Sequence, residues 1–120
     1  MPHCILEYSD NIKDITQWND LFIQLHKVLL DTGEFKKEDI KSRVLEYKNY
    51  YIGDGSPNQA FITLNIQILD GRSDKFKKEL AQSALNVLNK FFYNTLERMQ
   101  TSITVQISDI HRRSYSKSTS

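Results

Sequence analysis

The residue with the most distinctive chemistry in this sequence is the proline in second position. Pro2 follows the initiator Met1, and methionine before a small residue such as proline is normally removed. The processed chain then begins with a secondary amine, which acts as a general base when its pKa lies near the working pH. Burial and nearby cations both lower the pKa of an amine. The surroundings of Pro2 therefore decide whether it can take up a proton.

Three cationic residues are candidates for these surroundings. Lys41, Arg43 and Arg72 each fall at the edge of a predicted strand or helix. Cations at such a site lower the pKa of the amine, hold a carboxylate substrate and stabilise the negative charge that develops on an enolate. In an extended chain Lys41 and Arg43 point to the same face. Spacing alone favours ordinary solvated surface charges for each of the three.

Other catalytic patterns are weak. His3, His26 and His111 lie far apart, with no cysteine or histidine at metal-ligand spacing, so we expect strand or surface histidines and no metal site. Cys4 lies in an apolar stretch and is expected to be a small buried hydrophobe. The glycines follow neither nucleotide-binding pattern. We therefore expect no cofactor.

The composition indicates one domain. The chain has 120 residues and a formal net charge of +1, so it has no electrostatic attraction to nucleic acid or an anionic membrane. Residues 59–64 faintly resemble a strand motif of RNA-binding proteins but lack its leading basic residue and most of its aromatics. The N-terminus does not read as a signal peptide, and one cysteine fits a reducing compartment, so we expect a cytoplasmic protein.

Hydrophobic periodicity divides the chain into six elements around a turn at residues 53–58. We expect strands over 3–8, 43–52, 62–68 and 103–108, and helices over 15–29 and 76–96. Gly33 is expected to end the first helix and Ser73 to cap the second. The single domain, 1–120, then contains two strand–helix–strand units, 1–55 and 59–111, and a tail, 112–120, that we expect to be mobile.

This order predicts an α+β fold with a four-stranded sheet and both helices on one face. The other face is expected to expose more apolar surface than a monomer tolerates, which favours an oligomer. An open-faced two-layer domain is the alternative.

Short patches along nearly the whole chain carry a family resemblance. They are MPH at 1–3, Glu7, SDNI at 9–12, TG at 32–33, Ile40, SRV at 42–44, DG at 54–55, AF at 60–61, GRS at 71–73 and, more faintly, IH at 110–111. In this order and spacing the chain resembles the 5-carboxymethyl-2-hydroxymuconate isomerases of the tautomerase superfamily.

The resemblance implies a homotrimer and a cofactor-free proton shuttle. Pro2 would remove a proton from a dienol carboxylate and return it to a distant carbon, giving the unsaturated keto isomer in homoprotocatechuate (4-hydroxyphenylacetate) degradation. The family has two catalytic arginines besides the proline. By the resemblance, one corresponds to Arg72, and the other to position 41, where this sequence has Lys41.

Lysine at position 41 keeps the charge but loses the bidentate grip of arginine on a carboxylate. Lys41 could act as a looser anchor, or Arg43 could take over. Alternatively the substrate is another 2-hydroxydienoate or a phenylpyruvate-like enol. A non-catalytic trimeric scaffold of the same fold is the competing class, because Pro2 cannot act as a base if Met1 is retained.

Overall fold

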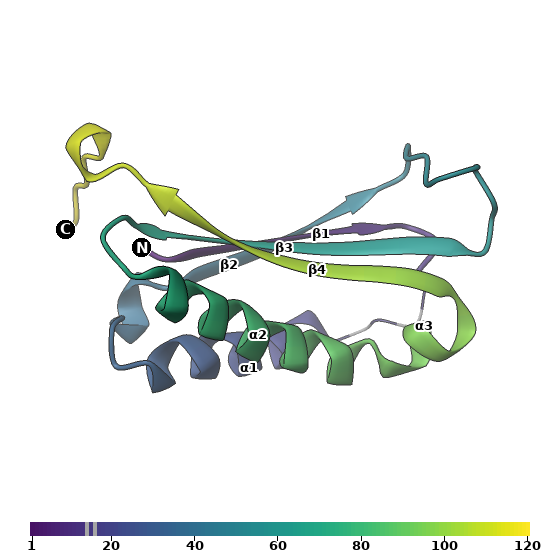
Figure 1. Ribbon diagram of the computed structural model, residues 1–120, viewed down its shortest axis with the longest axis horizontal. Helices are drawn as coiled ribbons and strands as arrows, with labels where there is room; N and C mark the ends of the chain where they lie inside the picture. The colour runs from purple at the N-terminus through teal and green to yellow at the C-terminus, as the bar shows by residue number, and fades with distance from the viewer. Residues whose placement is uncertain (14, 16) are drawn as a thin grey trace.

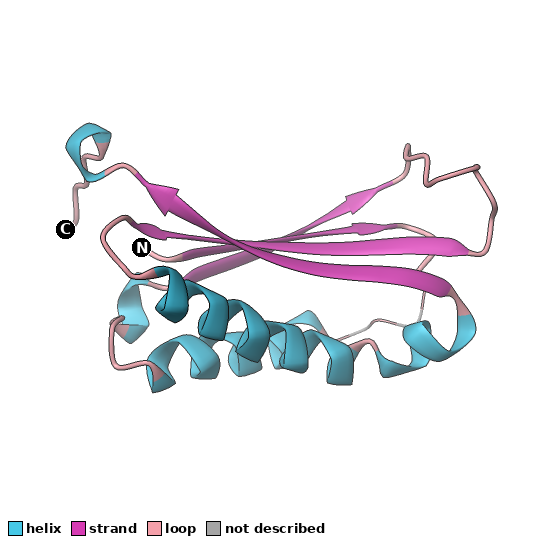
Figure 2. Cartoon of the chain, viewed as in Figure 1, coloured by secondary structure: helices cyan, strands magenta, loops and turns pink. Residues whose placement is uncertain are grey.

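The computed structural model describes residues 1–13, 15 and 17–120. One four-stranded sheet lies on a single layer of helices (Figures 1 and 2). The elements in chain order are β1 (His3–Ser9), α1 (Trp18–Asp31), the 3-10 turn η1 (Lys37–Asp39), β2 (Lys41–Tyr47), β3 (Gln59–Leu69), α2 (Asp74–Phe91), α3 (Tyr93–Arg98), β4 (Gln100–Ile110) and the 3-10 turn η2 (Arg112–Ser114).

The strands lie in the order β2-β1-β3-β4. β1 is parallel to β2 and β3 is parallel to β4, while β1 and β3 run antiparallel at the centre. Each parallel pair is connected through a helix, as parallel neighbours require. The predicted α+β fold, with the helices on one face of the sheet, is confirmed.

The core lies between the sheet and the helices. The alternating residues of β3 that face the helices are at most 1% exposed, and they are Ala60, Ile62, Leu64, Ile66 and Ile68. The helices pack against this face with buried residues at four-residue spacing. They are Leu21, Leu25 and Leu29 in α1 and Leu80, Ala84 and Leu88 in α2. The strand and helix periods of the sequence therefore predicted this interface correctly. Cys4 is buried in it, as expected, with 1% exposure.

Several element boundaries differ from the prediction, and β3 and β4 are both longer than expected. β2 ends at Tyr47, because the aromatics that follow it lie in the connection to β3 instead of the sheet. The helix expected over 76–96 is divided at Phe92, whose buried ring ends α2, and Leu96 is 38% exposed in α3 instead of belonging to the buried stripe. The helix expected over 15–29 begins at Trp18; Thr16, within the expected range, lies outside the described residues.

The two expected caps are present. Gly33 follows α1 with φ of 75°, a left-handed conformation that glycine adopts without strain. The hydroxyl of Ser73 accepts a hydrogen bond from the backbone N–H of Phe76 at 3.1 Å and so caps α2. Among the described residues, no helix is long and apolar enough to cross a membrane.

The open face of the sheet differs from the expectation. On β3 and β4 it carries mainly hydroxyl and amide side chains, including Thr63, Asn65, Gln67, Thr104 and Gln106. The expectation was wrong because the apolar residues of these strands alternate toward the helices. Exposed apolar side chains on this face gather on β2, where Leu45 is 50% and Tyr47 37% exposed.

Candidate functional site

Pro2 lies at the beginning of β1 and is fully buried. Its carbonyl oxygen accepts a hydrogen bond from the backbone N–H of Lys41 at 3.1 Å, which continues the parallel pairing of β1 with β2. In strand alternation Pro2 points to the same face as Cys4, toward the helices. The ring is thus held in the apolar layer at the point where the chain begins.

Lys41 and Arg43 lie on the open face of β2, and both are exposed. The Nη1 atom of Arg43 lies 3.1 Å from Nδ1 of His3 on the neighbouring strand. The ammonium of Lys41 folds back and donates to the carbonyl oxygen of Asp39 at 3.1 Å. The two cations therefore share one face, as their spacing predicted, on the strand next to Pro2.

His3 is a neighbour of Pro2 that the sequence analysis treated as an ordinary strand histidine. Its pKa is lowered, first by burial and then by Arg43, the N-terminal amine and Lys41. Its Nδ1 faces a guanidinium that can only donate, so this nitrogen is an acceptor and the ring is neutral in this arrangement. The signal in the sequence was its place next to Pro2 on an extended strand.

The N-terminal amine has the environment that a weak base needs. The pKa of the amine, which is on Met1, is lowered first by burial and then by Lys41; Asp39 opposes this shift and Lys117 supports it. After removal of Met1 the amine belongs to Pro2, one residue further into the same surroundings. Burial and adjacent cations, the two causes considered for Pro2 from the sequence, thus both act at this end of the chain.

Arg72 lies in the turn between β3 and α2, near the same end of the sheet. The antiparallel register pairs His3, the first residue of β1, with Gln67, two residues before the end of β3. The Nη1 atom of Arg72 donates to the carbonyl oxygen of Leu69 at 3.1 Å. Arg72 and the beginning of β1 are therefore held at one edge of the fold.

Arg72 is more deeply engaged than a surface arginine. Its side chain is 18% exposed, and its Nε lies 3.6 Å from a carboxylate oxygen of Glu34. Its guanidinium carbon lies 4.8 Å from the ring centre of Phe35. The expectation of a surface charge was wrong, because the loop after α1 folds over the turn and covers the guanidinium. Arg72 therefore joins two loops in addition to any contact with a substrate.

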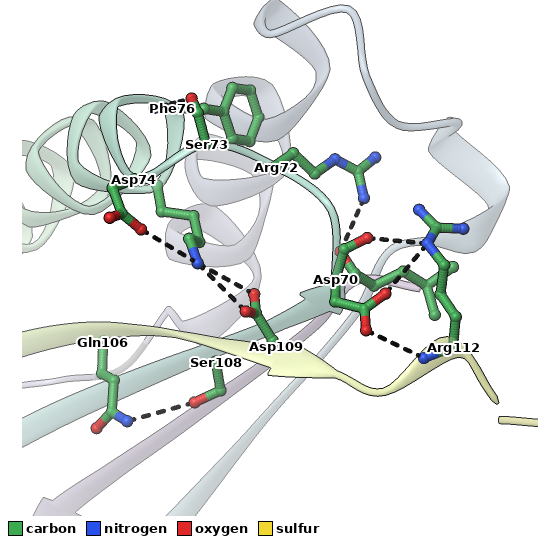
Figure 3. A network of polar contacts seen from close by, with 11 residues as sticks. Asp70, Arg72, Ser73, Asp74, Phe76, Gln106, Ser108, Asp109 and Arg112 are labelled. Atoms are coloured by element: carbon green, nitrogen blue, oxygen red, sulfur yellow. Dashed lines mark hydrogen bonds and ion pairs between the residues drawn. The ribbon is translucent and has the colours of Figure 1, made fainter. Parts of the chain in front are cut away.

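The tail returns to this edge of the molecule, where both ends of the chain lie (Figure 1). The Nε atom of Arg112 donates to the carbonyl oxygen of Asp70 at 2.8 Å, and Figure 3 shows Asp70 between Arg72 and Arg112. Further along, Nζ of Lys117 lies 3.0 Å from Oδ1 of Asp39. No role at the site was predicted for the tail from the sequence; its mobility stays a prediction.

The buried thiol offers no nucleophile. Burial raises the pKa of Cys4 to about 11, so the thiolate is scarce near neutral pH. Ser42, its partner on β2, lies 2.7 Å from Nε2 of His26 on α1. The side chain of His26 is therefore occupied by a contact on the helix side of the sheet. The groups with potential chemistry at the N-terminal edge are the amine and the nearby cations.

The described fold, with a buried proline beginning the first strand, is that of a tautomerase-like domain. The sequence model of the 5-carboxymethyl-2-hydroxymuconate isomerase family matches residues 2–120, and the chain belongs to this family of enzymes. It is 27% identical over 111 residues to the 5-carboxymethyl-2-hydroxymuconate Delta-isomerase of Escherichia coli, covering 92% of this chain and 88% of the relative.

Solved structures agree. A 5-carboxymethyl-2-hydroxymuconate isomerase from Deinococcus radiodurans R1 is 29% identical and superposes with a TM-score of 0.91 over 99% of this chain and 90% of that one. A fused 4-OT wild type symmetric trimer is similar in fold alone, at 16% identity and a TM-score of 0.66, covering 96% of this chain and 90% of that one.

Proposed function

We propose that this chain converts 5-carboxymethyl-2-hydroxymuconate to its unsaturated keto isomer, with the amine of Pro2 as the proton carrier. The observation that supports this most strongly is the N-terminal edge itself, where Pro2 is buried and the pKa of the preceding Met1 amine is lowered by burial and by Lys41. Membership in the isomerase family supplies the substrate.

The reaction moves one proton. The neutral amine of Pro2 takes the proton of the dienol hydroxyl, and electrons shift along the conjugated system. The ammonium then returns that proton to the distant carbon, which leaves a ketone at the former enol carbon. No net proton is gained or lost, so the amine is regenerated. A base of this kind works best when its pKa is near the working pH, and the pKa of the Met1 amine at the same end of the chain is lowered in that direction.

The cations hold the carboxylates and the transient negative charge. Arg43 and Lys41 are exposed on the open face, so both are accessible to an anionic substrate. We assign Arg72 to the same task. Its guanidinium has five N–H donors, and those that do not contact Leu69 or Glu34 remain for a substrate carboxylate. Charge that develops on the dienolate is stabilised by such fixed cations more than charge in the ground state.

As a second function, we propose that this chain isomerises another 2-hydroxydienoate. The observation that favours it is Lys41, which presents a single ammonium at the position where the resemblance implies an arginine, and which is already bonded to the carbonyl of Asp39. An ammonium holds a carboxylate without the two parallel hydrogen bonds of a guanidinium. A substrate with fewer or differently placed carboxylates fits that change.

We further propose that the chain is a homotrimer packed through the open sheet face. The relative described as a fused trimer shares the fold, and the open face of β2 exposes Leu45 and Tyr47. Light scattering behind size exclusion should give three protomers of 14.1 kDa; a monomer at micromolar concentration would contradict the assembly.

An ultraviolet ketonisation assay on Met1-free protein tests the substrate. We expect faster conversion of 5-carboxymethyl-2-hydroxymuconate than of 2-hydroxymuconate or an aryl enolpyruvate. Preference for one of the other compounds would favour the second function. Failure to convert any of them would point to a scaffold and refute both.

A further inference from the structure

Besides Arg112, a second basic residue from the C-terminal part of the chain, Lys117, lies at the N-terminal edge. Lys117 lies in the tail after η2, and its Nζ is 3.0 Å from Oδ1 of Asp39 at the end of η1. Both side chains are partly covered, at 39% and 30% exposure. The contact spans 78 positions of sequence and places Lys117 beside the start of β2.

Asp39 is the carboxylate at this edge whose negative charge stabilises the protonated form of a nearby amine. Its main chain holds Lys41, whose backbone N–H is bonded to the carbonyl of Pro2. An unpaired carboxylate here would favour the protonated form of the amine. Lys117 is placed to cancel this charge at a distance of one hydrogen bond.

The remaining charged groups around the amine have other partners. His3, on β1, is bonded to Arg43 of β2. Arg72, in the turn after β3, is paired with Glu34 of the loop that follows α1. The ammonium of Lys41 in β2 donates to the main-chain carbonyl of Asp39, whereas the hydrogen bond to the Asp39 carboxylate comes from Lys117. The charge of the Asp39 carboxylate near the amine is therefore countered by Lys117.

We propose that Lys117 is a positioning residue of the isomerase, which neutralises Asp39 and so keeps the Pro2 amine in its basic form. This rests on the proposed function of Pro2 as the base. The shifts of the Met1 amine, one residue before Pro2, have the same direction: Lys117 lowers its pKa and Asp39 raises it. The pKa of Asp39 is itself lowered, chiefly by its hydrogen bond with Lys117.

The test reads the amine directly. The chain has two prolines, Pro2 and Pro57, so labelling with ¹⁵N-proline gives two nitrogen signals, and only that of Pro2 titrates in Met1-free protein. We expect Lys117→Met to raise the pH at which Pro2 titrates and Asp39→Asn to lower it. The double variant, which removes both charges, should titrate close to the wild type.

Activity gives a second reading. On the acid side of the pH profile, Lys117→Met should lose about threefold in kcat/KM, because one nearby positive charge is removed. Lys90→Met is the matched control, because Lys90 is exposed in the last turn of α2, and it should leave both readings unchanged.

The outcomes separate the two proposals. An unmoved Pro2 titration in both single variants would overturn the role of Lys117, and so would a change confined to KM, since that would place Lys117 on the substrate. A Met1-free wild type that titrates but converts no enol substrate would instead contradict the proposed function.

Discussion

Replacing Arg72 with alanine should weaken the fold as well as the activity. The Arg72 side chain is 18% exposed, and its guanidinium donates to the carbonyl oxygen of Leu69 at 3.1 Å and lies 4.8 Å from the ring centre of Phe35. A hydrogen bond from a charged donor contributes about 1.5 kcal/mol, and a cation–π contact contributes about 0.5–1 kcal/mol. The ion pair with half-exposed Glu34 adds less than about 0.5 kcal/mol.

We therefore expect the free energy of unfolding to fall by about 2 kcal/mol and Tm to fall by about 8 °C. Urea unfolding followed by Trp18 fluorescence measures this, at one protomer concentration because assembly couples to stability. Glu34→Gln is the control: it removes only the ion pair, so its midpoint should move by a small fraction of that shift. An Arg72→Ala midpoint equal to the wild-type midpoint would refute the clamp between the two loops.

Three further changes test separate parts of the account. Lys41→Arg should raise turnover of 5-carboxymethyl-2-hydroxymuconate, because a guanidinium grips a carboxylate with two hydrogen bonds; an unchanged rate would favour a different enol. Ser73→Ala should lower the free energy of unfolding by about 1 kcal/mol through loss of the α2 cap, and an unshifted denaturation curve would show that the cap contributes nothing. Burial lowers the pKa of His26 below its ordinary value of 6.5, so the unfolded chain takes up this proton first and stability should fall as the pH drops below 6.5. His26→Gln should flatten this acid decline in a pH series of unfolding curves; an identical slope would mean that other groups cause it.

The elements that the sequence predicted well are those whose pattern repeats. The alternation of Ile62, Leu64 and Ile66 and the helical stripes through Leu25 and Leu88 determine which faces meet, and the structure places them together. Boundaries were less predictable where aromatics continue past an element. Tyr50 lies beyond β2 against Phe61, at 6.0 Å between ring centres, so its burial depends on a contact that local pattern does not contain.

The residue types of the candidate site could be proposed from the sequence, but their contacts could not. Pro2, Lys41 and Arg43 follow from chemistry and strand spacing, since β1 and β2 lie side by side. The contacts of Arg72 and Lys117 depend on how two loops and the tail fold against the turn after β3. Such contacts join residues far apart in sequence, and single residues of this kind leave no periodic signal.

The same chain with and without Met1 tests the central claim most directly. Both forms, verified by intact mass, are compared in the ultraviolet ketonisation assay with 5-carboxymethyl-2-hydroxymuconate. We predict turnover by the Met1-free form and a loss on the order of 100-fold or more when Met1 is retained, because the Pro2 nitrogen is then an amide and general base catalysis is removed. Equal rates in the two forms would contradict Pro2 as the base.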